Sequence, residues 1–227
     1  MADLGRYQKM IWETSRRLAE ERYLVGTGGN VSARVEGEEL IAITPSSMDY
    51  LAMQESDVCV VDFNRQPVAG ERRPSIEAGM HLAVYKNRPD VSAVIHTHQV
   101  YPSLFALIGE PIPPLFDEQV VNLGDSVAVV PYGLSGSDDL LRNIAAAVVS
   151  QCNAFFLQNH GALLLGRSME KAVINVKLLD KVAQAYSLAL STHKSVQLLP
   201  DNVSALLFAL LKAEQKKEAD RRQAPAS

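Results

Sequence analysis

Three histidines adjoin apolar segments that predict β-strands. His96 and His98 follow the run 91–95, and His160 follows the run 154–157. Side chains at positions i and i+2 of a strand point to the same face, so we expect His96 and His98 to project together. If the two strands are neighbours, three imidazoles converge, which is the usual ligand set of a catalytic Zn²⁺ or similar ion. The alternative is that His96 and His98 are ordinary strand-end histidines and that His160 caps a loop, because an isolated His-x-His is a short signal.

One carboxylate, Glu77, lies in the predicted first turn of a helix that opens at Pro74. The helix dipole stabilises a carboxylate there, so Glu77 can simply belong to the helix start. It can equally be a fourth metal contact that doubles as a general base, because a carboxylate beside a cation can exchange between ligand and proton carrier. The residues alone leave both interpretations open. His81 and His193 are interpreted as bystanders on or after helices.

Small polar residues gather in three predicted loops. Their backbone N–H, hydroxyl and amide groups are of the kind that hold a phosphate, and a helix N-terminus at one of them favours an anion. Taken singly, each loop is more often just a turn. The chain has neither GxxxxGK[ST] nor GxGxxG between a strand and a helix, which argues against a nucleotide site. The candidate phosphate-binding residues are Gly29, Asn30, Ser46, Ser47 and Ser75.

The elements that must position these residues follow from hydrophobic periodicity and turn signals. Strands and helices are interspersed, and several strands come as hairpin-like pairs. We therefore expect one layered α/β domain over 1–227 with a mixed, largely antiparallel sheet. From about 213 to 227 the chain turns polar and is expected to fray. Helices are predicted over 3–22, 75–86, 135–149, 168–192 and 202–217, and strands over 31–34, 39–44, 58–63, 91–95, 127–130, 154–157 and 162–165.

Composition excludes several classes of protein. The chain has 227 residues, of which 47% are hydrophobic, enough for one domain with a sizeable core. Its formal charge of −4 is mild and dispersed, which argues against binding nucleic acid or an anionic membrane. No apolar run is long enough to span a bilayer, and no secretory signal is visible. Cys59 and Cys152 lie in apolar settings and are typical of buried thiols, so we expect a cytoplasmic protein.

Four segments together resemble the class II aldolase and adducin-head family, which includes L-fuculose-1-phosphate aldolase and L-ribulose-5-phosphate 4-epimerase. They are GTGGNVSAR at 26–34, ITPSSMDY at 43–50, RPSIEAGMHLAVYKNRPDVSAVIHTH at 73–98 and LQNHGALLLG at 157–166. The resemblance is ordered and covers roughly residues 5–195. It implies a three-layer α/β/α fold around the mixed sheet, and a homotetramer with active sites at subunit interfaces.

The resemblance also implies roles for the candidate residues. His96, His98 and His160 would bind Zn²⁺, or another divalent ion such as Mn²⁺ or Co²⁺. Glu77 matches the acidic position, where glutamate is typical of the aldolases and aspartate of the epimerase. The polar loop residues Gly29, Asn30, Ser46, Ser47 and Ser75 match positions that hold the substrate phosphate.

Two departures leave the substrate and the proton donor open. The fuculose-phosphate enzyme has a second serine after the position of Ser75, where this chain has Ile76, and Arg73 is a candidate to compensate. That enzyme's proton-donating tyrosine, contributed by a neighbouring subunit, is replaced here by Asp117, counted from His98. Asp117 or the adjacent Glu118 could serve as the acid.

The expected activity is cleavage of a ketose 1-phosphate to dihydroxyacetone phosphate and an aldehyde, through a Zn²⁺-stabilised enediolate with Glu77 as proton carrier. A sugar-phosphate epimerase, a dehydratase or a 3-oxo-tetronate phosphate decarboxylase would use the same metal site. A non-catalytic scaffold like the adducin heads is the third alternative. The complete set of three histidines and Glu77 argues against the scaffold.

Overall fold

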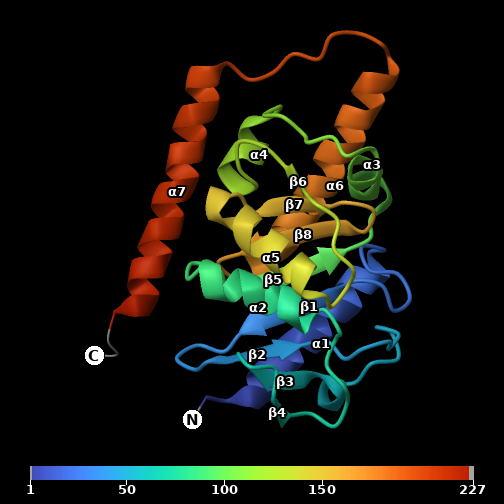
Figure 1. The fold of residues 1–227 in the computed structure, drawn as a ribbon, viewed down its shortest axis with the longest axis vertical. Helices are drawn as coiled ribbons and strands as arrows, with labels where there is room; N and C mark the ends of the chain where they lie inside the picture. The colour runs from blue at the N-terminus through green and yellow to red at the C-terminus, as the bar shows by residue number, and fades with distance from the viewer. Residues whose placement is uncertain (1, 225–227) are drawn as a thin grey trace.

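A sheet of eight strands forms the centre of the computed structural model, which describes residues 2–224 (Figure 1). The strand order is β4-β3-β2-β1-β5-β8-β7-β6, and every neighbouring pair is antiparallel except β6 with β7. The expected mixed, largely antiparallel sheet is therefore confirmed. The strands are β1 (Asn30–Arg34), β2 (Leu40–Ile43), β3 (Cys59–Asp62), β4 (Pro67–Ala69), β5 (Ala93–Thr97), β6 (Ala128–Val130), β7 (Ala154–Leu157) and β8 (Gly161–Gly166).

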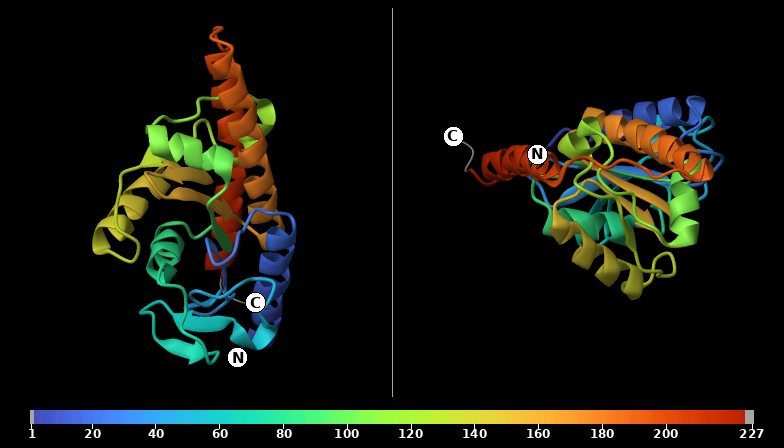
Figure 2. Two further views of the ribbon diagram at one scale, coloured as in Figure 1. Left: turned by 90° about the vertical axis from the view of Figure 1, so that its right-hand side faces the viewer. Right: turned by 90° about the horizontal axis from the view of Figure 1, so that it is seen from above.

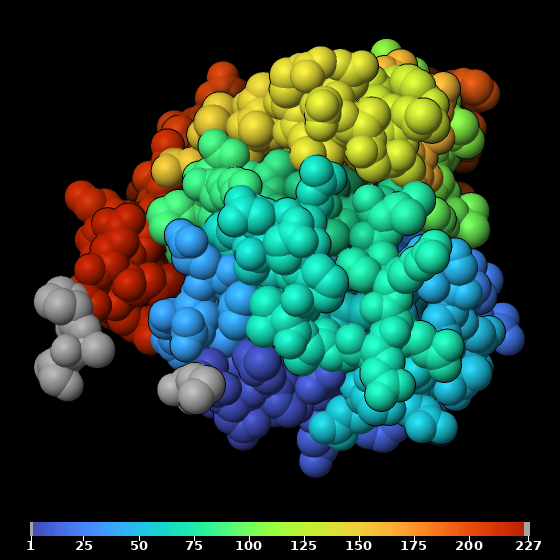
Figure 3. All heavy atoms as spheres, turned by 60° about the horizontal axis from the view of Figure 1, so that its bottom comes forward, coloured from blue at the N-terminus to red at the C-terminus, as the bar shows by residue number. Residues whose placement is uncertain are grey.

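Helices cover both faces of this sheet, which makes the fold a three-layer α/β/α sandwich. α1 (Leu4–Glu20), α3 (Val100–Ile108) and α6 (Met169–Ser191) pack on one face, and α2 (Ala78–Asn87) and α5 (Asp138–Ala147) on the other (Figure 2, right). Figure 3 shows α2 and α5 side by side on the second face. Within residues 2–224, no helix is long and apolar enough to cross a membrane. The remaining helices are α4 (Asp117–Asn122), α7 (Asp201–Gln223) and two 3-10 turns, Glu55–Asp57 and Val148–Ser150.

Strand alternation directs one polar row of the sheet toward α2. Val31 and Ala33 of β1 join the core under α1 and α6, so the alternate residues Asn30 and Ser32 face α2. His96 of β5 is the register partner of Asn30 and lies on the same face. The apolar layer beneath α2 therefore contains a polar row that leads to the candidate site.

Two helices and one strand begin or end at residues other than those predicted. α2 begins at Ala78, because residues 75–77 form a turn, and Glu77 therefore precedes the helix instead of lying in its first turn. α5 begins at Asp138, three residues later than predicted, and is capped by Ser137, whose hydroxyl accepts a hydrogen bond from the Leu140 N–H. β5 continues to Thr97, so that His96 lies within the strand.

The expectation of a frayed tail from about 213 is wrong as far as Gln223, where α7 ends. The polar residues of this segment make ion pairs at helical spacing: Glu218 pairs with Arg221 at 2.8 Å and with Arg222 at 2.9 Å. Pairs at i,i+3 and i,i+4 stabilise a helix, so polarity here indicates a solvated helix face instead of disorder. Residues 225–227 of the predicted tail lie outside the described residues.

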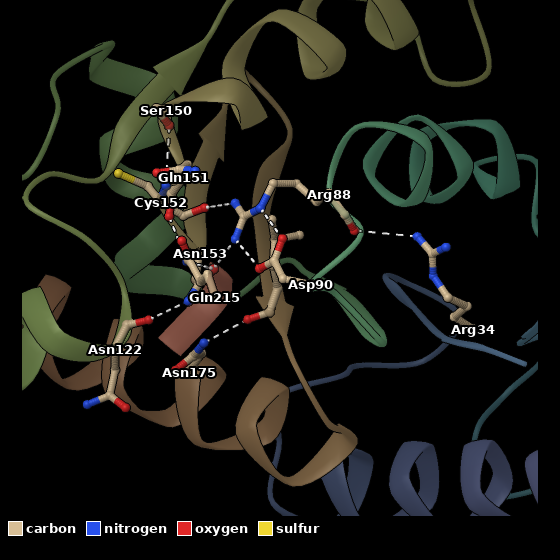
Figure 4. Close-up of polar contacts among 11 residues, drawn as sticks. Arg34, Arg88, Asp90, Asn122, Ser150, Gln151, Cys152, Asn153, Asn175 and Gln215 are labelled. Carbon is tan, nitrogen blue, oxygen red and sulfur yellow. Dashed lines mark hydrogen bonds and ion pairs between the residues drawn. The ribbon is translucent and has the colours of Figure 1, made fainter. Parts of the chain in front are cut away.

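A buried polar network holds the end of α2 against the strand layer (Figure 4). The Arg88 guanidinium binds the Asp90 carboxylate through two hydrogen bonds of 2.8 and 2.7 Å. It also donates to the Cys152 carbonyl and to Oδ1 of Asn153. Nε2 of Gln215, from α7, donates to the same Asn153 oxygen, so the network also anchors the last helix.

We expect Arg88→Ala to lower the free energy of unfolding by about 3–5 kcal/mol, because it leaves the Asp90 carboxylate buried without its partner. Urea unfolding of the purified variant measures this loss. Arg16→Ala is the control, since the Arg16–Glu20 pair is half exposed and its loss should cost less than about 1 kcal/mol. Equal effects of the two substitutions would contradict the assignment.

Candidate active site

The three histidines meet at one end of the central strands. His96 lies on β5, His98 follows it, and His160 lies in the tight turn that joins β7 to β8. Their candidate ligand nitrogens all lie within 4.8 Å of one another, and Nε2 of His96 is 2.8 Å from Nε2 of His98. The expected convergence is present, although β8, and not β7, is the strand that neighbours β5.

Two glycines allow the backbone to approach these histidines. A Cβ on Gly161 would lie 2.8 Å from Cδ2 of His98 and would also press on the carbonyl of Thr97. Gly29 has φ +80°, and a Cβ there would lie 2.5 Å from the carbonyl oxygen of His96. Both positions therefore exclude any side chain, which explains why a glycine adjoins each half of the cluster.

Glu77 lies against the cluster, and both of its carboxylate oxygens are engaged. Oε1 is 3.2 Å from Nε2 of His160 and accepts a hydrogen bond of 3.0 Å from the Ser135 hydroxyl. Oε2 is 3.5 Å from Nε2 of His96 and accepts a hydrogen bond of 2.6 Å from Nδ2 of Asn30. The carboxylate is buried and held in one orientation between two imidazoles.

The surroundings favour a charged Glu77 beside a neutral His96. Burial raises the pKa of the Glu77 carboxyl, but His96, the Asn30 hydrogen bond and His160 together outweigh burial, and the pKa lies well below its ordinary value. Burial lowers the pKa of His96 despite the carboxylate beside it. Because His96 is then neutral at pH 7, we attribute the charged state of Glu77 there chiefly to its hydrogen-bond donors.

This donor set fits a divalent transition-metal ion. A carbonyl oxygen only accepts, so His96 Nδ1 donates its hydrogen to Ala162, 2.8 Å away, and the lone pair of its Nε2 remains available for a metal. Such a hydrogen bond commonly fixes the tautomer of a metal-binding histidine. Neutral imidazoles and one carboxylate suit Zn²⁺, Mn²⁺ or Co²⁺. The residues that could hold the ion are His96, His98, His160 and Glu77.

The loops predicted to bind phosphate are joined to one another beside Glu77. A β-bridge pairs Pro45 with Pro74, which places Ser46 and Ser47 next to Ser75. The Ser75 hydroxyl accepts a hydrogen bond of 3.2 Å from the Glu77 backbone N–H. Asn30, where the third loop meets β1, donates a hydrogen bond to the Glu77 carboxylate. Hydroxyl, amide and backbone N–H groups therefore lie close to the candidate general base.

The departures from the family pattern fall on exposed positions. Ile76 is 68% exposed and Arg73 is exposed on the same loop, whereas Ser75 is buried. Asp117 and Glu118 are exposed in the first turn of α4, where Glu118 pairs with Lys181 of α6. Within residues 2–224, no hydrogen bond or ion pair joins Asp117 or Glu118 to the histidine cluster. Their role as proton donors is taken up below as a proposal.

Two residues at the site were not predicted to take part in its chemistry. Ser135 is the first residue of the predicted helix 135–149, but in the structure it precedes α5 and its hydroxyl binds Glu77. His81 was interpreted as a bystander, but it is fully buried and hydrogen-bonded to Asn30 and Ser32. The available signal was spacing, because His81 lies one helical turn after Glu77 and would share its face of the helix.

We expect His81 to make stability depend on pH. Burial lowers its pKa to about 4, against about 6.5 in the unfolded chain. Between these values the unfolded state binds a proton that the native state does not, so stability falls as pH decreases from about 6.5 to about 4, by up to about 1.4 kcal/mol per pH unit. Urea unfolding of the metal-free protein across this range should give a flatter curve for His81→Gln than for the wild type. Parallel curves would contradict this prediction.

Comparisons with known proteins agree with this geometry. The family described as Class II Aldolase and Adducin N-terminal domain matches residues 9–187. An L-fuculose phosphate aldolase of Methanococcus maripaludis (strain C7) is 34% identical over 167 residues, which cover 74% of this chain and 88% of that protein. A 5-deoxy-D-ribulose 1-phosphate aldolase of Bacillus thuringiensis serovar kurstaki is 30% identical, covering 71% of this chain and 75% of its own.

A solved structure of an L-fuculose 1-phosphate aldolase superposes with a TM-score of 0.85 at 33% identity. The match covers 91% of this chain and 96% of that chain. The sheet order, the helical layers and the family match agree, so the chain belongs to the class II aldolase and adducin N-terminal domain family.

Proposed function

We propose that this protein is a metal-dependent aldolase that cleaves a ketose 1-phosphate to dihydroxyacetone phosphate and an aldehyde. The observation that carries the proposal is the position of Glu77, whose carboxylate lies between His96 and His160 and is also bound to Asn30 of a predicted phosphate loop. A proton carrier, a metal-binding set and phosphate-binding groups thereby adjoin one another. The 5-deoxy-D-ribulose 1-phosphate aldolase and the solved L-fuculose 1-phosphate aldolase compared above also act, by their names, on ketose 1-phosphates.

The chain's own residues would divide the reaction as follows. Asn30, Ser46, Ser47, Ser75 and the backbone of Gly29 bind the phosphate. When the C3–C4 bond breaks, its electron pair stays on C3, and Glu77 delivers there a proton that its carboxylate first takes up from solvent. In the direction of synthesis the Glu77 carboxylate removes that proton and returns it to solvent. A divalent ion held by the three histidines, with Glu77 as a further ligand, would supply Lewis-acid polarisation of the C2 carbonyl.

A second carboxyl group must take the proton of the C4 hydroxyl as the aldehyde forms. Asp117 and Glu118 are exposed on α4, and within residues 2–224 no hydrogen bond or ion pair joins them to the histidines of their own subunit. We therefore assign this step to one of them acting on a neighbouring subunit. This assignment requires an oligomer, which we propose to be a homotetramer with active sites at its interfaces. We further propose that the enzyme is cytoplasmic.

The test is product analysis with a panel of ketose phosphates that includes L-fuculose 1-phosphate and 5-deoxy-D-ribulose 1-phosphate. We expect dihydroxyacetone phosphate and an aldehyde in equal amounts from at least one ketose 1-phosphate. Release of CO₂, a dehydrated product or an epimer without any aldehyde would overturn the proposal in favour of a decarboxylase, a dehydratase or an epimerase. Metal content is measured on the same preparation, because a protein that binds no transition metal would favour a scaffold.

A further inference from the structure

A row of polar side chains runs from Glu77 into the core between α2 and β1. His81 and Tyr85 are spaced four residues apart on α2, and Glu77, which directly precedes the helix, lies four residues before His81. Asn30 and Ser32 are two residues apart on β1. Four helical residues advance about 6 Å and two strand residues about 6.6 Å, so the two sets stay in step. This match lets His81 contact both Asn30 and Ser32.

The donor of each hydrogen bond in this row can be assigned in turn, starting from the Glu77 carboxylate at its end. The Glu77 carboxylate only accepts, so Asn30 presents its Nδ2 group to it, at 2.6 Å, and its Oδ1 to Nε2 of His81. Nε2 must then carry the imidazole hydrogen, which leaves Nδ1 as an acceptor for the Ser32 hydroxyl at 2.6 Å. Ser32 in turn accepts from the Tyr85 hydroxyl at 2.8 Å. The five groups form one chain of donors pointing toward Glu77.

We propose that His81 is a positioning residue that orients the Asn30 amide, and through it the Glu77 carboxylate. This inference rests on the proposed role of Glu77 as proton carrier, but the direction of the hydrogen bonds does not. If Nε2 of His81 lost its hydrogen, the Asn30 amide could turn and present Oδ1 to Oε2 of Glu77. Two oxygens in contact repel each other, and the carboxylate would leave the position between His96 and His160.

A purely structural role for His81 is the competing explanation, since a buried and hydrogen-bonded histidine can simply fill the core. The two roles differ in what must be preserved. A positioning role requires a donor at the place of Nε2, whereas a packing role requires only volume. Gln places its amide nitrogen near the position of Nε2 of histidine, and Leu keeps a similar volume without a donor.

The first measurement is the ¹⁵N NMR spectrum of His81 in the metal-free protein at pH 7. We expect a hydrogen on Nε2 and none on Nδ1, in the wild type. A hydrogen on Nδ1, or on both nitrogens, would overturn the proposal whatever reaction the enzyme catalyses. This result does not depend on activity, so it separates the present inference from the proposed function.

The second measurement is exchange of solvent deuterium into the hydroxymethyl carbon of dihydroxyacetone phosphate, the carbon that becomes C3 of the ketose. We expect His81→Leu to lower kcat by about 10- to 100-fold with little change in KM, and His81→Gln to stay within a few-fold of the wild type. Val176→Ala, a buried substitution in α6 outside the row, controls for lost stability. Equal activity of the Leu and Gln variants would overturn the proposal, whereas absence of exchange in the wild type would instead count against the proposed function.

Discussion

Replacing Glu77 by glutamine is expected to lower kcat for proton exchange into dihydroxyacetone phosphate by about 10²- to 10⁴-fold, the usual contribution of a positioned general base. Gln has nearly the same shape, so the core beneath α2 should remain intact. One of its terminal atoms becomes a nitrogen that cannot accept hydrogen bonds. Because Asn30 approaches Oε2 as an obligatory donor, that nitrogen will take the side of Ser135, whose hydroxyl can reverse its role.

Three measurements make this prediction specific to the base. Deuterium exchange reports the proton step, elemental analysis reports whether the variant still binds metal through its three histidines, and thermal unfolding reports the fold. Glu55→Gln, an exposed carboxylate in the 3-10 turn before β3, is the matched control and should exchange at the wild-type rate. Wild-type exchange by Glu77→Gln with metal bound would remove Glu77 from the proton step.

The elements with strong periodicity could be predicted from the sequence almost to the residue. The strand 154–157 and the helix 168–192 correspond to β7 and α6. The helices α3 and α4 were missed for local reasons. α3 contains Pro102 and is apolar on most sides, which hides its period, although proline is tolerated in a first turn. α4 has six residues, and its stability depends on packing against α6 and α7 that no local pattern reveals.

The convergence of side chains could be predicted where it follows strand parity, and could not where it depends on a helix face. His96 and His98 could be paired because alternation along a strand needs no knowledge of the partner strands. The partners of His81 could not be predicted in this way, because α2 is buried on all sides and its apolar residues define no single face. Only the packing of α2 on β1 shows that its polar residues meet Asn30 and Ser32. The four-residue spacing from Glu77 was a local signal, but spacing alone does not distinguish a lone histidine in an apolar helix from a core residue.

Removal of the metal is expected to have the other large effect. A chelator should abolish aldehyde formation, and Zn²⁺, Mn²⁺ or Co²⁺ should restore it, because in the proposed reaction the ion would supply Lewis-acid polarisation of the C2 carbonyl. The ion should also raise the melting temperature, since it binds the native cluster and stabilises it by about 2.7 kcal/mol at 100 times its Kd. Activity assays and thermal unfolding of the chelated and reloaded protein measure both effects.

The histidines provide the control for this experiment. His98→Ala removes a nitrogen that lies 2.8 Å from Nε2 of His96, and it should abolish both the metal-induced stabilisation and the activity. His193→Asn changes an exposed histidine with φ +56°, a conformation that asparagine tolerates, and should leave both unchanged. If the chelated wild type kept full activity, or if His98→Ala were stabilised by the ion as strongly as the wild type, the cluster would not be the metal site. The protein's chemistry would then have to be carried by Glu77 and its hydrogen-bond donors alone.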